Sequence, residues 1–103
     1  MKYEINESTG KTVLHVSGDM TVSDRDAFDG LLPRLFHSGS RDVAIDLADL
    51  EYMDSAGLGM LLTLHKKAQE KGARVAIRNP VGEVKKMLEL ACFDLLFAIE
   101  HGK

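Results

Sequence analysis

Residues 43–62 read VAIDLADLEYMDSAGLGMLL, and the hydrophobic period of this stretch changes halfway along. In the first half Val43, Ile45 and Leu47 recur at every second position, which is the period of a strand with one buried face. The second half opens a long apolar segment, and Gly72 follows it as a stop signal. We therefore expect a strand that passes directly into a helix ending at Gly72.

Asp54 stands at the junction between these two segments. An aspartate in this position accepts a hydrogen bond from an otherwise unpaired backbone N–H of the first helical turn. Met53 and Leu58 are spaced as a hydrophobic staple around it. The sequence thus predicts Asp54 as the helix N-cap and places Ser55 in the first turn.

The remaining segments extend the alternation of strands and helices. Before residue 43, the apolar spacing predicts a hairpin over the first 16 residues and a helix that starts at Ser23, has a kink or break at Pro33 and stops at Gly39. After Gly72 it predicts a strand over 73–78, a helix that includes Val84 and Ala91, and a strand over 95–99. The order is β-β-α-β-α-β-α-β. Because strand-helix-strand units pair in parallel, whereas a hairpin is antiparallel, we expect an α/β fold with a mixed sheet.

Length and charge narrow the classes of function. The 103 residues suffice for one domain, residues 1–103, and the net charge of −3 with no tryptophan disfavours nucleic acid as a ligand. No segment has the roughly 20 apolar residues of a membrane span, and the first ten residues lack the apolar run of a signal peptide. We therefore expect a cytoplasmic protein without membrane insertion. The single cysteine, Cys92, is expected to act as a small hydrophobic residue.

Residues for catalysis or metal binding do not form a recognised pattern. The four histidines are scattered over separate segments, and the glycines at 57 and 59 match neither a phosphate loop nor a dinucleotide fingerprint. A cluster of carboxylates could serve acid-base chemistry or magnesium, although such clusters more often cap helices or face solvent; its members are Asp46, Asp49, Glu51 and Asp54. We expect neither enzymatic activity nor a cofactor or metal.

One face of the 55–72 helix is apolar where solvent is expected. At 100° per residue, Ser55, Gly59 and Leu62 fall opposite the buried stripe, which consists of Gly57, Leu61, Leu64 and Ala68. A serine at the tip, a glycine without a side chain and an exposed leucine describe a surface that the backbone of another protein can approach. The alternative is that another element of the same chain covers this face.

Phosphorylation of Ser55 would act on that surface. The phosphate adds about −1.5 to −2 charges, which a helix N-terminus tolerates. It would lie beside Asp54 and at the edge of any partner docked on Leu62, so the fold should survive while the interface is lost. Ser55 is therefore a candidate switch.

The sequence resembles the STAS domains, typified by the stand-alone anti-sigma factor antagonists of bacteria. The resemblance is carried by VSGDM at 16–20, by VAIDLADLEYMDSAGLGMLL at 43–62 and by VKKMLELACFDLLFAI at 84–99. Its most specific part is the D-S-x-G-L-G block that begins at Asp54. The resemblance implies the STAS fold, a mixed sheet with helices mainly on one face.

The resemblance also implies partner switching. In its unphosphorylated form, such an antagonist binds an anti-sigma factor that is also a serine kinase, and a sigma factor is thereby freed. The kinase then phosphorylates the antagonist, and a phosphatase removes the phosphate again. The phosphorylated serine falls on Ser55, and the implied partner surface comprises Asp54, Ser55, Gly57, Leu58, Gly59, Leu62 and Thr21. Thr21 stands where many members carry an acid, and Ala56 where many carry a second hydroxyl residue. The free protein is expected to be a monomer.

Two other hypotheses stay open. The first is a non-switching STAS subunit of a larger assembly, such as a lipid-transport ABC system, in which Ser55 only caps a helix. The second is a small-molecule or nucleotide-binding module, which requires a pocket near the carboxylate cluster.

Overall fold

The computed structural model describes residues 1–36 and 41–101. Its elements are β1 (Lys2–Ser8), β2 (Lys11–Met20), the 3-10 helix η1 (Val22–Asp24), α1 (Arg25–Leu35), β3 (Asp42–Met53), α2 (Ser55–Lys71), β4 (Arg74–Arg78), α3 (Gly82–Leu90), the 3-10 helix η2 (Phe93–Leu95) and β5 (Ala98–Glu100). The predicted order of strands and helices is confirmed. None of the helices in the described part of the chain is long and apolar enough to span a membrane.

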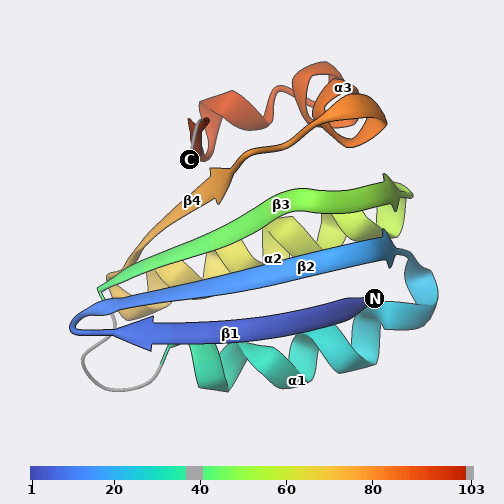
Figure 1. Ribbon diagram of the computed structural model, residues 1–103. Helices are drawn as coiled ribbons and strands as arrows, with labels where there is room; N and C mark the ends of the chain where they lie inside the picture. Colours follow the sequence, from blue (N-terminus) through green and yellow to red (C-terminus); the bar gives the residue numbers. More distant parts are fainter. Residues whose placement is uncertain (37–40, 102–103) are drawn as a thin grey trace.

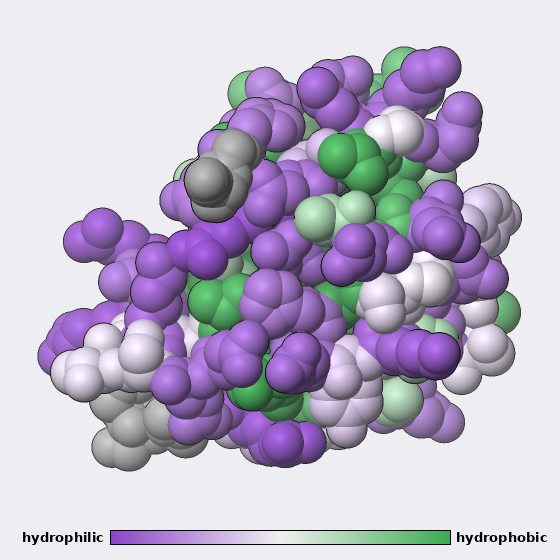
Figure 2. All heavy atoms as spheres, viewed as in Figure 1, coloured by the Kyte–Doolittle hydropathy of each residue, from purple (hydrophilic) through white to green (hydrophobic). Residues whose placement is uncertain are grey.

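The five strands form one sheet in the order β1-β2-β3-β4-β5 (Figure 1). The β1–β2 hairpin is antiparallel, and every following pair is parallel, as predicted. Helices α1 and α2 lie behind the strands in Figure 1, so the opposite face of the sheet is uncovered. Figure 2 shows this uncovered face as largely hydrophilic, with isolated apolar side chains.

The apolar core lies between the sheet and the helices. All three α-helices and η2 contribute buried side chains to a single cluster with β2, β3 and β4. Its most enclosed large members are Phe28, Leu14, Met20, Leu35, Ile45, Leu47, Leu50, Met53, Met60, Leu61, Leu64 and Ile77. Because both ends of the β3–α2 junction are anchored in this cluster, the junction is held firmly against the domain.

Strand β3 carries two irregularities before it reaches α2. His15 pairs with Asp46, and Ser17 pairs with Asp49, so β3 uses three residues where β2 uses two. A second register shift lies between Gly18 and Asp19 of β2. Each shift inserts an extra residue in β3, which is a β-bulge. The buried residues beyond the first bulge consequently lie three apart rather than two: Leu47, Leu50 and Met53.

Helix α1 runs through Pro33 and ends at Leu35, so the predicted break at Pro33 is wrong. Pro33 lies in the last turn of α1 and is exposed. Because proline has no N–H, the carbonyl of Asp29, four residues earlier, has no helical donor, and Asp29 is also exposed. Water can satisfy that carbonyl, which lowers the cost of proline there. The predicted stop at Gly39 lies outside the described residues.

The last predicted strand is shorter than its apolar run. Strand β5 begins at Ala98, and the preceding residues form η2 instead of a strand. Phe93 and Phe97 are buried and stacked with ring centroids 5.6 Å apart, whereas Leu95 is 80% exposed. A helical turn brings two residues four apart onto one side, so the aromatic pair sets the local structure. Cys92 is exposed and not the buried hydrophobic residue that we expected.

Candidate functional site

Asp54 joins two loops at the end of the sheet. Its Oδ1 accepts a hydrogen bond from the Gly57 backbone N–H at 3.1 Å, which confirms it as the N-cap of α2. Its Oδ2 accepts a second hydrogen bond, from the Val22 N–H at 3.3 Å. The Asp54 N–H donates to the Met20 carbonyl at 3.3 Å. One residue thus fixes the start of α2 against the loop that leads into α1.

Ser55 is the first residue of α2 and is exposed. Its hydroxyl makes no hydrogen bond with any side chain or backbone group of the described residues. The carboxylate of the neighbouring Asp54 already accepts hydrogen bonds as the helix cap, whereas the Ser55 hydroxyl is free to react or to bind another group. Ser55 is therefore accessible to a reagent or enzyme in solution.

Ser55, Gly59 and Leu62 lie on one side of α2, and Val22 of η1 lies beside the start of this helix, where its N–H donates to Asp54 Oδ2. We call these four residues the Ser55 face. Leu62 is 44% exposed and Val22 is 68% exposed. Leu62 therefore stays open to solvent, whereas Gly59 is half-buried with Arg25 of α1 lying against it. The alternative of an internally covered face thus applies to the part of the face around Gly59 and not to Leu62. The helical wheel placed the three α2 residues correctly, but it gave no indication of Val22.

Two predicted partner residues face the domain instead of solvent. Gly57 is buried, and a Cβ added to it would overlap Met53 and lie 2.9 Å from the Met20 carbonyl oxygen. Leu58 is half-buried and packs against the core. The close approach that Gly57 permits is therefore between α2 and the ends of β2 and β3.

Thr21 lies at the edge of the same site and is the N-cap of η1. Its N–H donates to Asp24 Oδ2 at 2.9 Å, and its hydroxyl lies 2.9 Å from the Ser23 hydroxyl. The Thr21 N–H is the main cause that lowers the pKa of Asp24; burial opposes it, and the Met1 amine, 3.2 Å from Asp24, adds to it. Thr21 thus caps η1.

The carboxylate cluster does not converge on one point. Asp46 lies 3.4 Å from His15 Nδ1 and accepts from the Ala48 N–H at 2.9 Å, while Asp54 is the double cap described above. Within residues 1–36 and 41–101, no three potential metal ligands are grouped together. Asp46 and Asp54 therefore make local hydrogen bonds, each to its own neighbours, while Asp49 and Glu51 are exposed.

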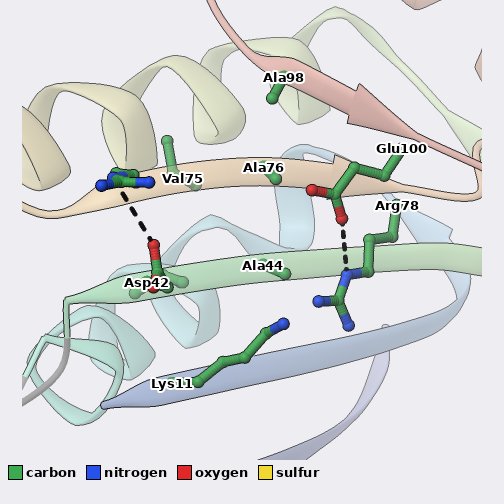
Figure 3. Close-up of a pocket in the computed structure, with 10 residues that line it drawn as sticks. Lys11, Asp42, Ala44, Val75, Ala76, Arg78, Ala98 and Glu100 are labelled. Atoms are coloured by element: carbon green, nitrogen blue, oxygen red, sulfur yellow. Dashed lines mark hydrogen bonds and ion pairs between the residues drawn. The ribbon is translucent and has the colours of Figure 1, made fainter.

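A hollow of about 330 Å³ lies on the uncovered face of the sheet. Its floor includes Ala44, Ala76 and Ala98 from three adjacent strands (Figure 3). On its rim Arg78 pairs with Glu100 at 3.0 Å, and Arg74 pairs with Asp42 at 4.0 Å. Most rim charges thus neutralise one another, and the hollow opens on the face opposite α2. No residue of the carboxylate cluster lines this hollow, so it is not the pocket that the small-molecule hypothesis requires. A smaller hollow of about 210 Å³ lies beside Asp46 and Asp49.

Comparison with known proteins identifies the family. Residues 4–98 match the family model described as "Mlab, STAS domain". The chain therefore belongs to the STAS domain family. A STAS-domain containing protein of Pseudomonas aeruginosa is 39% identical over 59 residues, which are 57% of this chain and 58% of that relative. The candidate anti-sigma factor antagonist BtrV of Bordetella bronchiseptica is 21% identical over 103 residues, covering 100% of this chain and 89% of BtrV.

The fold is that of solved anti-sigma factor antagonists. A candidate antagonist from Thermotoga maritima superimposes with a TM-score of 0.85 at 19% identity, covering 95% of this chain and 85% of that one. The Bacillus cell fate determinant SpoIIAA in its phosphorylated form superimposes with a TM-score of 0.70 at 13% identity, covering 99% and 92%. Its unphosphorylated form gives 0.77 at 14% identity, with coverage of 99% and 90%.

Proposed function

We propose that this protein is an anti-sigma factor antagonist that works by partner switching, with Ser55 as its phosphorylation site. The observation that carries the proposal is the free, exposed hydroxyl of Ser55 on the same surface as Leu62 and Val22. Family membership and the presence of phosphorylated and unphosphorylated SpoIIAA among proteins of this fold support it. Antagonists of this kind are regulatory proteins and not enzymes.

In the unphosphorylated state the Ser55 face binds an anti-sigma factor that is also a serine kinase. At Gly59 the partner backbone approaches α2 by displacing only the end of the Arg25 side chain, and the exposed side chains of Leu62 and Val22 supply apolar contact area. Binding displaces a sigma factor from the kinase. The free antagonist is a monomer and acts in the cytoplasm.

Phosphorylation ends the complex. Ser55 Oγ attacks the γ-phosphorus of ATP held by the kinase, the bond from that phosphorus to the bridging oxygen breaks, ADP leaves, and the serine proton passes to a base of the kinase. The added charge must then be desolvated when the partner docks, so binding is lost. A phosphatase that hydrolyses the phosphoserine restores the active form.

The test combines phosphorylation and binding. We expect the kinase encoded near the gene to phosphorylate Ser55 with ATP, as mapped by mass spectrometry, and Ser55→Ala to abolish incorporation. Ser55→Asp should weaken binding to the kinase at least tenfold, or about 1.4 kcal/mol, as measured by calorimetry. Ser8→Asp is the matched control, because Ser8 is exposed at the opposite end of the sheet.

Two results would overturn the proposal: phosphate on another residue, or a Ser55→Asp variant that binds as tightly as wild type. A constitutive complex without phosphate on Ser55 would instead favour the non-switching subunit of a larger assembly. Leu62→Asp tests the docking surface itself, because it should weaken binding of the kinase and slow phosphorylation of Ser55 although the serine is unchanged.

A further inference from the structure

The side chain of Arg25 lies against the exposed side of α2. Its Nη2 is 3.1 Å from the position that a Cβ of Gly59 would occupy. Arg25 is the first residue of α1 and is half-buried, and it forms no ion pair with any described residue. The guanidinium reaches this position because Gly59 has no side chain.

Ser55 lies on the same side of the helix, four residues before Gly59. Side chains at this spacing begin about 5–6 Å apart, so the guanidinium lies about one helical turn from Ser55. The segments 21–25 and 54–59, which Asp54 joins, contain no other basic residue. Arg25 is therefore the cation that these two segments offer to a group on Ser55.

The two carboxylates of these segments, Asp24 and Asp54, already have partners. Asp54 accepts hydrogen bonds from the N–H groups of Gly57 and Val22. Asp24 accepts from the Thr21 N–H and lies 3.2 Å from the Met1 amine. Neither carboxylate forms an ion pair with Arg25, so the guanidinium donors remain available for another acceptor.

We propose that Arg25 binds the phosphate of phosphorylated Ser55. This inference rests on the proposed phosphorylation of Ser55 and adds a residue that reads the modification. A guanidinium presents paired N–H donors that match the oxygens of a phosphate. The bound phosphate would hold the Arg25 guanidinium over Gly59, so phosphorylation would keep the α2 backbone covered at this point, in addition to changing the charge.

The test uses phosphoserine incorporated at position 55 by genetic code expansion, and thus needs no kinase. The readout is the phosphate pKa, followed by ³¹P NMR, because a guanidinium contact stabilises the dianion. An unperturbed phosphoserine titrates near pH 6; we expect a lower pKa in the wild type, and Arg25→Gln should raise it by about half a unit or more. Asp54 and Asp24 are retained in both proteins, so their effect cancels in the difference.

Arg34→Gln is the matched control, because Arg34 is an exposed arginine in the last turn of the same helix. It should leave the phosphate pKa unchanged. The thermal unfolding midpoint of each unphosphorylated variant shows whether it folds. Equal phosphate pKa values in wild type and Arg25→Gln would overturn the inference without touching the proposal that Ser55 is phosphorylated. If the kinase does not phosphorylate Ser55, the proposed phosphorylation fails, but this titration still decides whether Arg25 contacts a phosphate at position 55.

Discussion

The two sides of α2 carry the same residue types under opposite conditions. On the inner side Gly57 and Leu61 are fully enclosed, and Gly57 has no room for even one additional carbon. On the outer side Gly59 meets only the end of the Arg25 side chain, and Leu62 is 44% exposed. Composition alone cannot distinguish these sides. Gly57 and Leu61 pack into the core, whereas Gly59 and Leu62 lie on the outer side of the helix. Substitutions on the inner side should therefore lower the stability of the fold, and substitutions on the outer side should change it much less.

The largest difference is expected between the adjacent leucines. Leu61→Ala opens a cavity in the core and should lower the free energy of unfolding by about 3 kcal/mol. Leu62→Ala should lower it by about 0.5 kcal/mol or less, because this side chain is already partly hydrated. Urea unfolding of both variants measures the contrast. Similar losses for the two variants would mean that another element of the chain covers Leu62.

The two glycines give the next contrast. Gly57→Ala forces a methyl group against Met53 and the Met20 carbonyl, and overpacking of this kind costs about 1–3 kcal/mol. Gly59→Ala gains helix propensity of up to about 1 kcal/mol, offset by a small displacement of Arg25. We expect destabilisation in the first variant and unchanged or slightly raised stability in the second, by thermal unfolding. Destabilisation by Gly59→Ala would contradict its assignment to the outer side.

Asp54 lies between the two sides, and its removal should have an intermediate effect. Asp54→Ala loses the cap of α2 and the bond to Val22, and loss of an N-cap costs about 1 kcal/mol. Asp49→Ala is the control, because Asp49 is an exposed carboxylate of β3 without such bonds to the described residues. Hydrogen exchange of the Gly57 and Val22 amides should accelerate together in Asp54→Ala. Acceleration of one amide without the other would show that the two bonds are separable.

The smallest effect is expected from pH. The Thr21 N–H lowers the pKa of Asp24 in the folded protein, so this group adds stability above its unfolded pKa of about 3.9. That contribution disappears as pH falls through the folded pKa. The stability difference between wild type and Asp24→Asn should therefore shrink on acidification below about pH 4. A difference independent of pH would exclude the charge of Asp24 as its source.

The sequence was sufficient to predict the order of elements because its hydrophobic periods are clear. The 3.6-residue period placed Leu61 inside and Leu62 outside, and the capping preference of aspartate located the start of α2. The chain also predicted the glycine stop: Gly72 adopts φ 68°, and the Ala73 N–H bonds back to the Ala68 carbonyl at 2.9 Å. These features depend on neighbours within one element, so local patterns are enough.

Features that depend on contacts between elements could not be predicted. The bulges of β3 arise from its pairing with β2, and no pattern of residues within β3 predicts them. The exposure of Val22 and the position of Arg25 depend on how α1 packs against α2. The apolar run before β5 was misjudged because Phe93 and Phe97 are both buried in the core that the helices and the sheet share, and this packing between elements outweighs strand propensity.

The double hydrogen bond of Asp54 has a consequence for the rate and strength of association. Val22 and Leu62 belong to different segments, yet one carboxylate holds the first segment to the start of the helix that carries the second. A protein that docks on both therefore meets a surface that is already ordered, and little conformational entropy remains to be lost on binding. Association can then proceed as a single rigid-body encounter, and loosening Asp54 should slow it, because both carboxylate oxygens of Asp54 are bonded within the domain.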